Sequence, residues 1–176
     1  SQILSIWRVV GRGCVEYWHL VSFRVEALIE TAGSLELNEM SEPDEKTIER
    51  MHRWFAVECK NRGWDLGAQD SRSDGENREI LQCAYAAALH WGKVGKPIND
   101  ARADTLLSRA HSNLNHGDLA IHYANLCLEF FEQNDCEDWD LAFAHGEMAY
   151  AAAVSGNYDL SQKHYELARN HGDQIK

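Results

Sequence analysis

Apolar residues recur every three or four positions along most of this chain, which is the period of a helix that buries one face. The pattern predicts helices over about 14–31, 44–62, 78–91, 99–115, 118–133, 138–155 and 158–171. No segment shows the strict alternation of apolar and polar residues that is typical of a half-buried strand. The sequence therefore predicts an all-α fold with six or seven helices.

The predicted helix over 44–62 begins at a recognisable signal. Ser41, with Asp44 three positions later, resembles a capping box, and Pro43 stands in the first turn, where its missing N–H costs nothing. The polar stretch over 67–77 is expected to be a surface loop. The apolar residues expected to face inward from this helix are Ile48, Met51, Trp54 and Phe55.

The C-terminal part of the chain contains a faint internal repeat. Two helical runs joined by a turn at Gly117 are followed by the same arrangement with a turn at Gly156, 39 residues further on. Ala110 and Ala149 have the same separation. Helix pairs at such a period stack side by side, because one pair cannot bury its apolar face alone. The small residues expected where helices cross are Ala84, Ala88, Ala110, Ala149 and Ala152.

The second unit of this repeat resembles a tetratricopeptide repeat. Ala149 stands at the small position of that repeat's first helix, and Tyr165 and Ala168 match its second helix. The turn over 156–159, Gly-Asn-Tyr-Asp, is similar to the turn of the repeat. The first unit departs from the pattern, because its turn at Gly117 is two residues shorter.

Residues 45–171 as a whole resemble an uncharacterised group of bacterial helical proteins. The phrases that carry this likeness are 55–59, 64–66, 90–95, 108–109 and 139–144. The resemblance implies antiparallel helix pairs stacked as a short, right-handed, tetratricopeptide-like α-α superhelix. By analogy it implies a module that binds proteins or peptides.

Composition narrows the class of partner. The chain has 176 residues, 44% of them hydrophobic, which is enough for one domain with a real core. Its formal net charge of −11 disfavours nucleic acid and anionic membranes as partners. The five cysteines show no zinc-site spacing, so we expect reduced thiols in a cytoplasmic protein.

Residues 1–39 differ from the rest, because they are apolar and weakly charged. The apolar run near 14–31 cannot span a bilayer, since it contains Glu16 and His19. Met40 would serve as a natural initiator, which would make 1–39 an upstream extension. Alternatively, its one apolar helix caps the stack or pairs two subunits in a homodimer. Residues 40–176 are expected to form the helical-repeat domain.

Charged and histidine side chains fall on several of the apolar stripes, where burial without a partner would cost free energy. They are Glu58, His90, Arg102, Arg109, His122, Asp140 and Glu147. The acids and arginines are expected either to form inter-helix ion pairs or to line a ligand pocket. The walls of such a pocket would be Trp54, Trp64, Trp91 and Trp139.

Two functions follow from these alternatives. An interaction module would show an open groove along the first helix of each pair, with His111, Asn115, Glu147 and Tyr150 as candidate groove residues. A small-molecule or metal binder, or an enzyme, would show an enclosed pocket around Glu58, His90, Arg102, Arg109 and Glu147. We find no catalytic or phosphate-binding motif, so the first is preferred, without a cofactor or a metal.

Overall fold

The computed structural model describes residues 42–175, which fold into six helices without a strand. All six belong to the unit of the chain that begins at Pro43. Their bounds are α2 Glu45–Gly67, α3 Asp74–Val94, α4 Pro97–Asn113, α5 Gly117–Gln133, α6 Asp138–Val154 and α7 Tyr158–Gly172. The all-α prediction is confirmed. The helix predicted near 14–31 and the expectations for residues 1–39 lie outside the described residues.

The first two described helices are longer than predicted, so the loop expected over 67–77 is shorter. α3 begins at Asp74 because Ser73 caps it: the Ser73 hydroxyl accepts from the Glu76 N–H, while the Glu76 carboxylate accepts from the Ser73 N–H. At the start of α2, the Asp44 carboxylate accepts from the Thr47 N–H at 2.7 Å. Asp44 is therefore the N-cap of α2.

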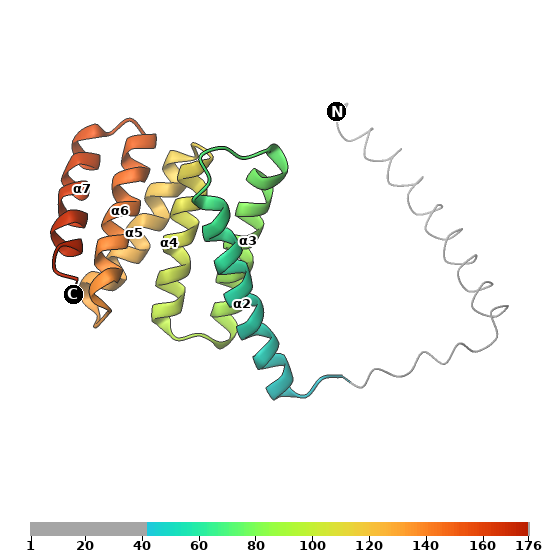
Figure 1. Ribbon diagram of the computed structural model, residues 1–176. Helices are drawn as coiled ribbons and strands as arrows, with labels where there is room; N and C mark the ends of the chain where they lie inside the picture. The colour runs from blue at the N-terminus through green and yellow to red at the C-terminus, as the bar shows by residue number, and fades with distance from the viewer. Residues whose placement is uncertain (1–41, 176) are drawn as a thin grey trace, which may run out of the picture. The chain divides into compact units, whose positions relative to one another are not determined.

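Consecutive helices pack as three antiparallel pairs, α2 with α3, α4 with α5 and α6 with α7 (Figure 1). The first helices of the pairs also pack on one another, α2 on α4 and α4 on α6. The backbones of α3, α5 and α7 stay apart, and α3 reaches α5 through side chains, where the Tyr85 and Tyr123 hydroxyls are 3.4 Å apart. The layer of α2, α4 and α6 is therefore the tight inner layer of the stack, and α3, α5 and α7 form its outer layer.

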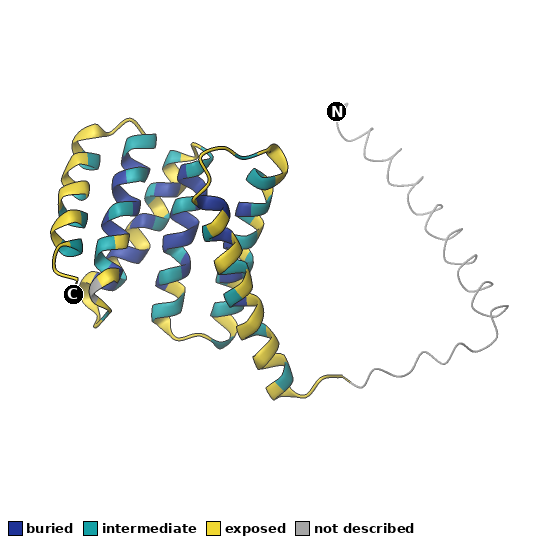
Figure 2. Ribbon diagram, viewed as in Figure 1, coloured by how far each residue is buried: buried dark blue, intermediate teal, exposed yellow. Residues whose placement is uncertain are grey.

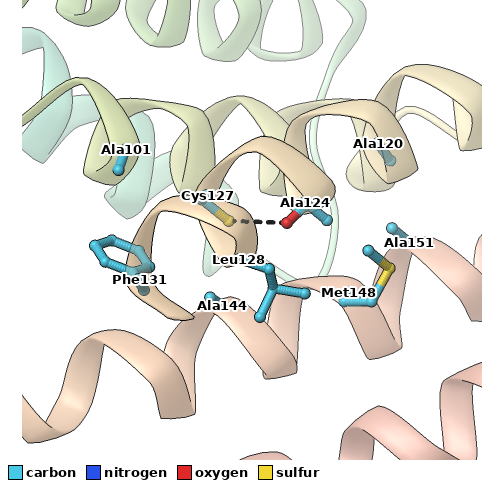
Figure 3. Close-up of a cluster of buried hydrophobic side chains, with 9 residues drawn as sticks. All are labelled: Ala101, Ala120, Ala124, Cys127, Leu128, Phe131, Ala144, Met148 and Ala151. Atoms are coloured by element: carbon cyan, nitrogen blue, oxygen red, sulfur yellow. Dashed lines mark hydrogen bonds between the residues drawn. The ribbon is translucent and has the colours of Figure 1, made fainter. Parts of the chain in front are cut away.

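The core consists of two clusters that meet at α4. One joins α2, α3 and α4 around Leu66, Ile80 and Leu106. The other joins α4, α5 and α6, with Ala124, Ala144 and Ala151 between Cys127, Leu128, Phe131 and Met148 (Figure 3). Alanines dominate because small side chains let helices approach closely. Dark blue, buried residues accordingly concentrate in the middle helices, whereas α7 has none (Figure 2).

The N-terminal half of α2 is exposed, so the prediction that its apolar residues face inward was wrong. Ile48, Met51, Trp54 and Phe55 are between 38% and 57% exposed. The buried residues of α2 are Ala56, Gly63, Leu66 and Gly67, all towards its C-terminal end. Only that end crosses α4. None of the described helices combines the length and apolar character that crossing a membrane would require.

Substitution by alanine should have opposite effects on stability at two glycines, Gly63 at the crossing of α2 with α4 and Gly146 on α6. A Cβ at Gly63 would lie 2.9 Å from Cδ2 of the fully buried Leu106, whereas a Cβ at Gly146 would meet nothing within 4 Å. Gly146→Ala should stabilise the fold by about 0.5–1 kcal/mol through helix propensity. Gly63→Ala should destabilise it by about 1–3 kcal/mol through overpacking. Urea unfolding measures both, and equal gains would contradict a close crossing.

Candidate functional site

Two ion pairs connect α4 to α6 along the inner layer. Arg102 Nε and Nη2 each donate to one oxygen of Asp140 at 2.8 Å. Two helical turns further along α4, Arg109 Nε and Nη2 donate to Glu147 at 2.6–3.0 Å. The arginines are seven residues apart on α4 and the acids seven apart on α6, so both pairs form in the same helix register. Two of the predicted inter-helix ion pairs are thus present.

Both acids are completely buried, while both arginine side chains remain 31% exposed. Asp140 also accepts from the Glu137 N–H at 3.0 Å, which helps to start α6. Burial raises the pKa of the Glu147 carboxyl, and the Arg109 guanidinium acts in the opposite direction. The Arg109–Glu147 pair therefore offsets only part of its own desolvation cost, as buried pairs commonly do.

Aromatic rings cover both guanidinium groups. The Arg102 guanidinium lies 4.5 Å from the ring centre of Trp139. The Arg109 guanidinium lies 5.8 Å from Trp64 and 5.4 Å from Tyr150. These cation–π contacts add attraction and exclude water from one side of each pair. They also bring α2 to the ion pairs, because Trp64 belongs to α2.

A pocket of about 260 Å³ opens between the helices of the inner layer. Four aromatic side chains line it, and polar groups from α2, α4 and α6 lie among them. Its lining residues are Lys60, Trp64, Trp91, Asn99, Arg102, Thr105, Trp139, Asp140 and Phe143. The predicted walls Trp64, Trp91 and Trp139 therefore meet around the Arg102–Asp140 pair, whereas Trp54 is not among the lining residues.

Glu58 does not belong to this pocket, contrary to expectation. It is exposed on the face of α2 that also carries Trp54, Asn61 and Asp65. The face of α2 towards α3 instead carries His52, which contacts His90, and Cys59, which packs against the core cluster around Ile80. The apolar residues one turn before Glu58 suggested burial, but they are exposed too.

The predicted histidines also lie elsewhere. His90 is half-buried against His52 and Phe55, at the α2–α3 contact. His122 is exposed on α5, where its ring contacts Tyr123. His111 is buried, with Nε2 2.9 Å from the Tyr85 hydroxyl of α3 and its ring stacked on Tyr123 of α5.

Three of the four predicted groove residues therefore need correction. His111 points to the outer layer rather than into a groove, and Asn115 lies in the turn after α4 with a φ of 58°. Glu147 is buried in its ion pair. Tyr150 does lie beside Arg109, and its hydroxyl donates to Asn113 Oδ1 at 3.1 Å. Asn113 in turn donates to the Gly67 carbonyl, which ties α6 to α2 through α4.

Each helix pair contains a close contact between the Nδ1 atoms of two histidines. The Nδ1 atoms of His52 and His90 are 2.7 Å apart, and those of His145 and His164 are 3.0 Å apart. In the middle pair, the Nδ1 atoms of His111 and His116 are 3.2 Å apart. Burial, and then the facing histidine, lowers the pKa of His90, His111 and His145. Each contact therefore requires at least one neutral ring, because two protonated rings would repel each other and offer no acceptor.

Sequence reasoning missed several lining residues. Lys60, Asn99 and Phe143 carry a weak signal, because each lies three or four positions from a predicted residue on the same helix. Lys60 precedes Trp64, Asn99 precedes Arg102 and Phe143 follows Trp139. Helical spacing puts such neighbours on one face. The signal becomes visible only once the inner layer is known.

The carboxylate of the pocket and the buried thiol of Cys127 are both poorly placed for acid–base or nucleophilic chemistry. Asp140, the one carboxylate among them, is occupied by Arg102 and by the Glu137 N–H. The buried thiol of Cys127 lies outside the pocket, and burial raises its pKa to about 12. No group of three or more histidine, cysteine or acidic side chains within residues 42–175 is arranged to hold a metal ion.

Comparison with protein families, curated proteins and solved structures finds no significant match to this chain. The fold and the geometry of the inner layer therefore carry the functional argument.

Proposed function

We propose that this protein is an interaction module that binds an extended peptide segment along its inner layer. One observation carries the proposal: α2, α4 and α6, together with Trp91 of α3, form a pocket lined by aromatic rings and polar groups. Trp139 and Phe143 there are 40% and 49% exposed, although large aromatic side chains gain free energy by burial. Exposed aromatic side chains around a recess are typical anchors for a partner.

The ion pairs support this proposal by holding the pocket walls in place. Trp139 and Phe143 come from α6, while Arg102 and Thr105 come from α4. The two Arg–carboxylate pairs fix the register of these helices, so the walls do not need to be ordered on binding. A preorganised surface loses less entropy when a partner binds. The tetratricopeptide-like turn at Gly156 is consistent with the same class of protein.

A small-molecule binder or an enzyme is the second candidate. The only features of the pocket that support this second candidate are its recessed shape and its aromatic lining. Its volume of about 260 Å³ falls below the roughly 300–1,000 Å³ typical of small-molecule sites. A recess of this size suits one large side chain of a peptide. The free thiols of Cys59, Cys83 and Cys127 fit our proposal of a cytoplasmic location.

Selection of peptides from a random displayed library, using the full chain as bait, tests this function. We expect Trp139→Ala to weaken the selected peptides at least about tenfold, because a central aromatic anchor is lost. Leu126→Ala is the matched control, since Leu126 is also 40% exposed but lies on α5 of the outer layer. Equal affinity for both variants, or no recovered peptide, would contradict the proposal.

A further inference from the structure

The pocket offers hydrogen-bond donors that the protein itself does not use. Lys60 makes no ion pair or hydrogen bond with any described residue. Arg102 contacts Asp140 through Nε and Nη2, which leaves Nη1 available. Asn99 accepts from the Lys96 N–H through Oδ1, so its amide NH₂ is also available. The three groups line the same recess.

The carboxylate of the pocket is already engaged, and its threonine hydroxyl has no free hydrogen to donate. Asp140 receives three hydrogen bonds, two from Arg102 and one from Glu137. The Thr105 hydroxyl donates to the Ala101 carbonyl of its own helix. The pocket therefore presents one unpaired cation, Lys60, together with the remaining N–H groups of Arg102 and Asn99, within a chain whose net charge is −11. Such a site is complementary to an anionic group.

The remaining walls are planar and apolar. Trp64 and Trp139 both contact Phe143 edge to face, with ring centres 6.2 and 5.8 Å apart. Trp91 completes the wall at the end of α3. Aromatic rings pair favourably with a further ring in offset or edge-to-face geometry. An occupant that carries both a ring and a carboxylate would use the whole lining.

We propose that the pocket takes an aromatic side chain of an extended peptide whose aspartate or glutamate, two residues away, contacts Lys60 and Arg102. In an extended chain, side chains two residues apart point to the same side, so both can face the inner layer. This inference rests on the proposed function, and it specifies the partner as an acidic, aromatic segment.

Two short peptides test this chemistry on the full chain. The probes are Ac-Gly-Phe-Gly-Asp-Gly-NH₂ and its Asn analogue, each also made with the two side chains in reverse order. Tryptophan fluorescence of the protein reports binding, since the peptides contain no tryptophan. We expect the Asp peptide to bind about tenfold more tightly than the Asn peptide, because a charge-assisted hydrogen bond is lost. Equal binding would overturn the proposal.

Lys60→Gln identifies the contact. It should remove the preference for the Asp peptide, since no described residue depends on Lys60 for an ion pair. Lys46→Gln is the matched control, because it makes the same charge change in the exposed first turn of α2 and should keep the preference. An unchanged preference in Lys60→Gln would contradict the assignment.

The two proposals can fail separately. Displayed peptides that depend on Trp139 but lack an acidic residue near the aromatic one would leave the proposed function standing and overturn this inference. Recovery of no Trp139-dependent peptide, together with equal binding of the two probes, would overturn both. Binding of free 3-phenylpropanoate without binding of either peptide would support a small carboxylate ligand instead and contradict the peptide proposal.

Discussion

Arg109→Met should destabilise the protein by about 3–5 kcal/mol at neutral pH, because it leaves Glu147 buried without its partner. Glu147 is completely buried, and Arg109 makes all of its described side-chain hydrogen bonds. The double variant Arg109→Met/Glu147→Met should recover most of the loss, since both desolvation costs then disappear. Urea unfolding of the two single variants and the double variant measures the coupling.

Two exposed sites provide the controls for this cycle. Arg53 pairs with Glu49 on the surface of α2, where both side chains are more than half exposed, so Arg53→Met should cost no more than about 1 kcal/mol. Glu58→Ala should likewise change stability by less than about 0.5 kcal/mol, because Glu58 is exposed. A loss in Arg109→Met no larger than in these controls would contradict a structural role for the ion pairs.

The pH dependence of Arg109→Met provides a second readout. Burial already raises the pKa of Glu147, and removal of the guanidinium that opposes this shift should raise it further. A carboxyl whose folded-state pKa is raised costs stability above that pKa, and the cost disappears as the group protonates. The stability difference between wild type and Arg109→Met should therefore shrink as the pH falls.

Acid should weaken the stack before most carboxylates titrate, because the buried histidines at the helix contacts resist protonation. The pKa of His145 is lowered to about 4 by burial and by His164, His171 and Lys163 of α7. A histidine with a lowered folded-state pKa contributes full stability above its unfolded value of about 6.5, and this contribution is lost as the pH falls towards the folded value. For His145 alone the loss at pH 4 should reach about 2–3 kcal/mol.

Other groups near the helix contacts shift the same balance. His90, His111 and His164 also have lowered pKa values, chiefly through burial, although Glu132 acts in the opposite direction on His164. Burial raises the pKa of Asp104 to about 6, so its protonation partly offsets the loss over the same range. The offset from Asp104 is the same in wild type and in a variant that changes only one histidine, so it cancels when their pH profiles are compared.

His145→Gln isolates the histidine effect. It should lower stability at pH 7 but flatten the fall in unfolding free energy between about pH 6.5 and pH 4. His122→Gln is the control, since His122 is exposed and should leave the pH profile unchanged. Urea unfolding at a series of pH values measures both. A profile for His145→Gln that runs parallel to that of wild type would show that His145 does not carry the acid sensitivity.

The helices and the inter-helix ion pairs could be predicted because their signals are local. Apolar spacing marks six of the helices, and two arginines and two acids that are each seven residues apart fit one register between two helices. Asp140 and Glu147 lie on apolar stripes, and such buried acids need partners. Each arginine is 38 residues from its acid, which is close to the 39-residue repeat of the helix pairs.

The exposed half of α2 and the membership of the pocket could not be predicted in this way. An amphipathic stripe shows that a helix has an apolar face, but Met51 and Trp54 lie where no described helix covers that face. His111 has the sequence position of a groove residue, yet its contacts with Tyr85 and Tyr123 depend on how α3 and α5 are placed. Such contacts follow from tertiary packing, which local periodicity does not encode.

The indole N–H signals of the protein in an NMR titration with a display-selected peptide test the central claim most directly. The chain has six tryptophans, and Trp→Phe variants assign their signals. If the inner-layer pocket binds the peptide, the signals of Trp64, Trp91 and Trp139 should shift together, while that of Trp54 on the exposed face of α2 stays in place. A shift of Trp54 with the other three unchanged would place binding elsewhere and contradict the account.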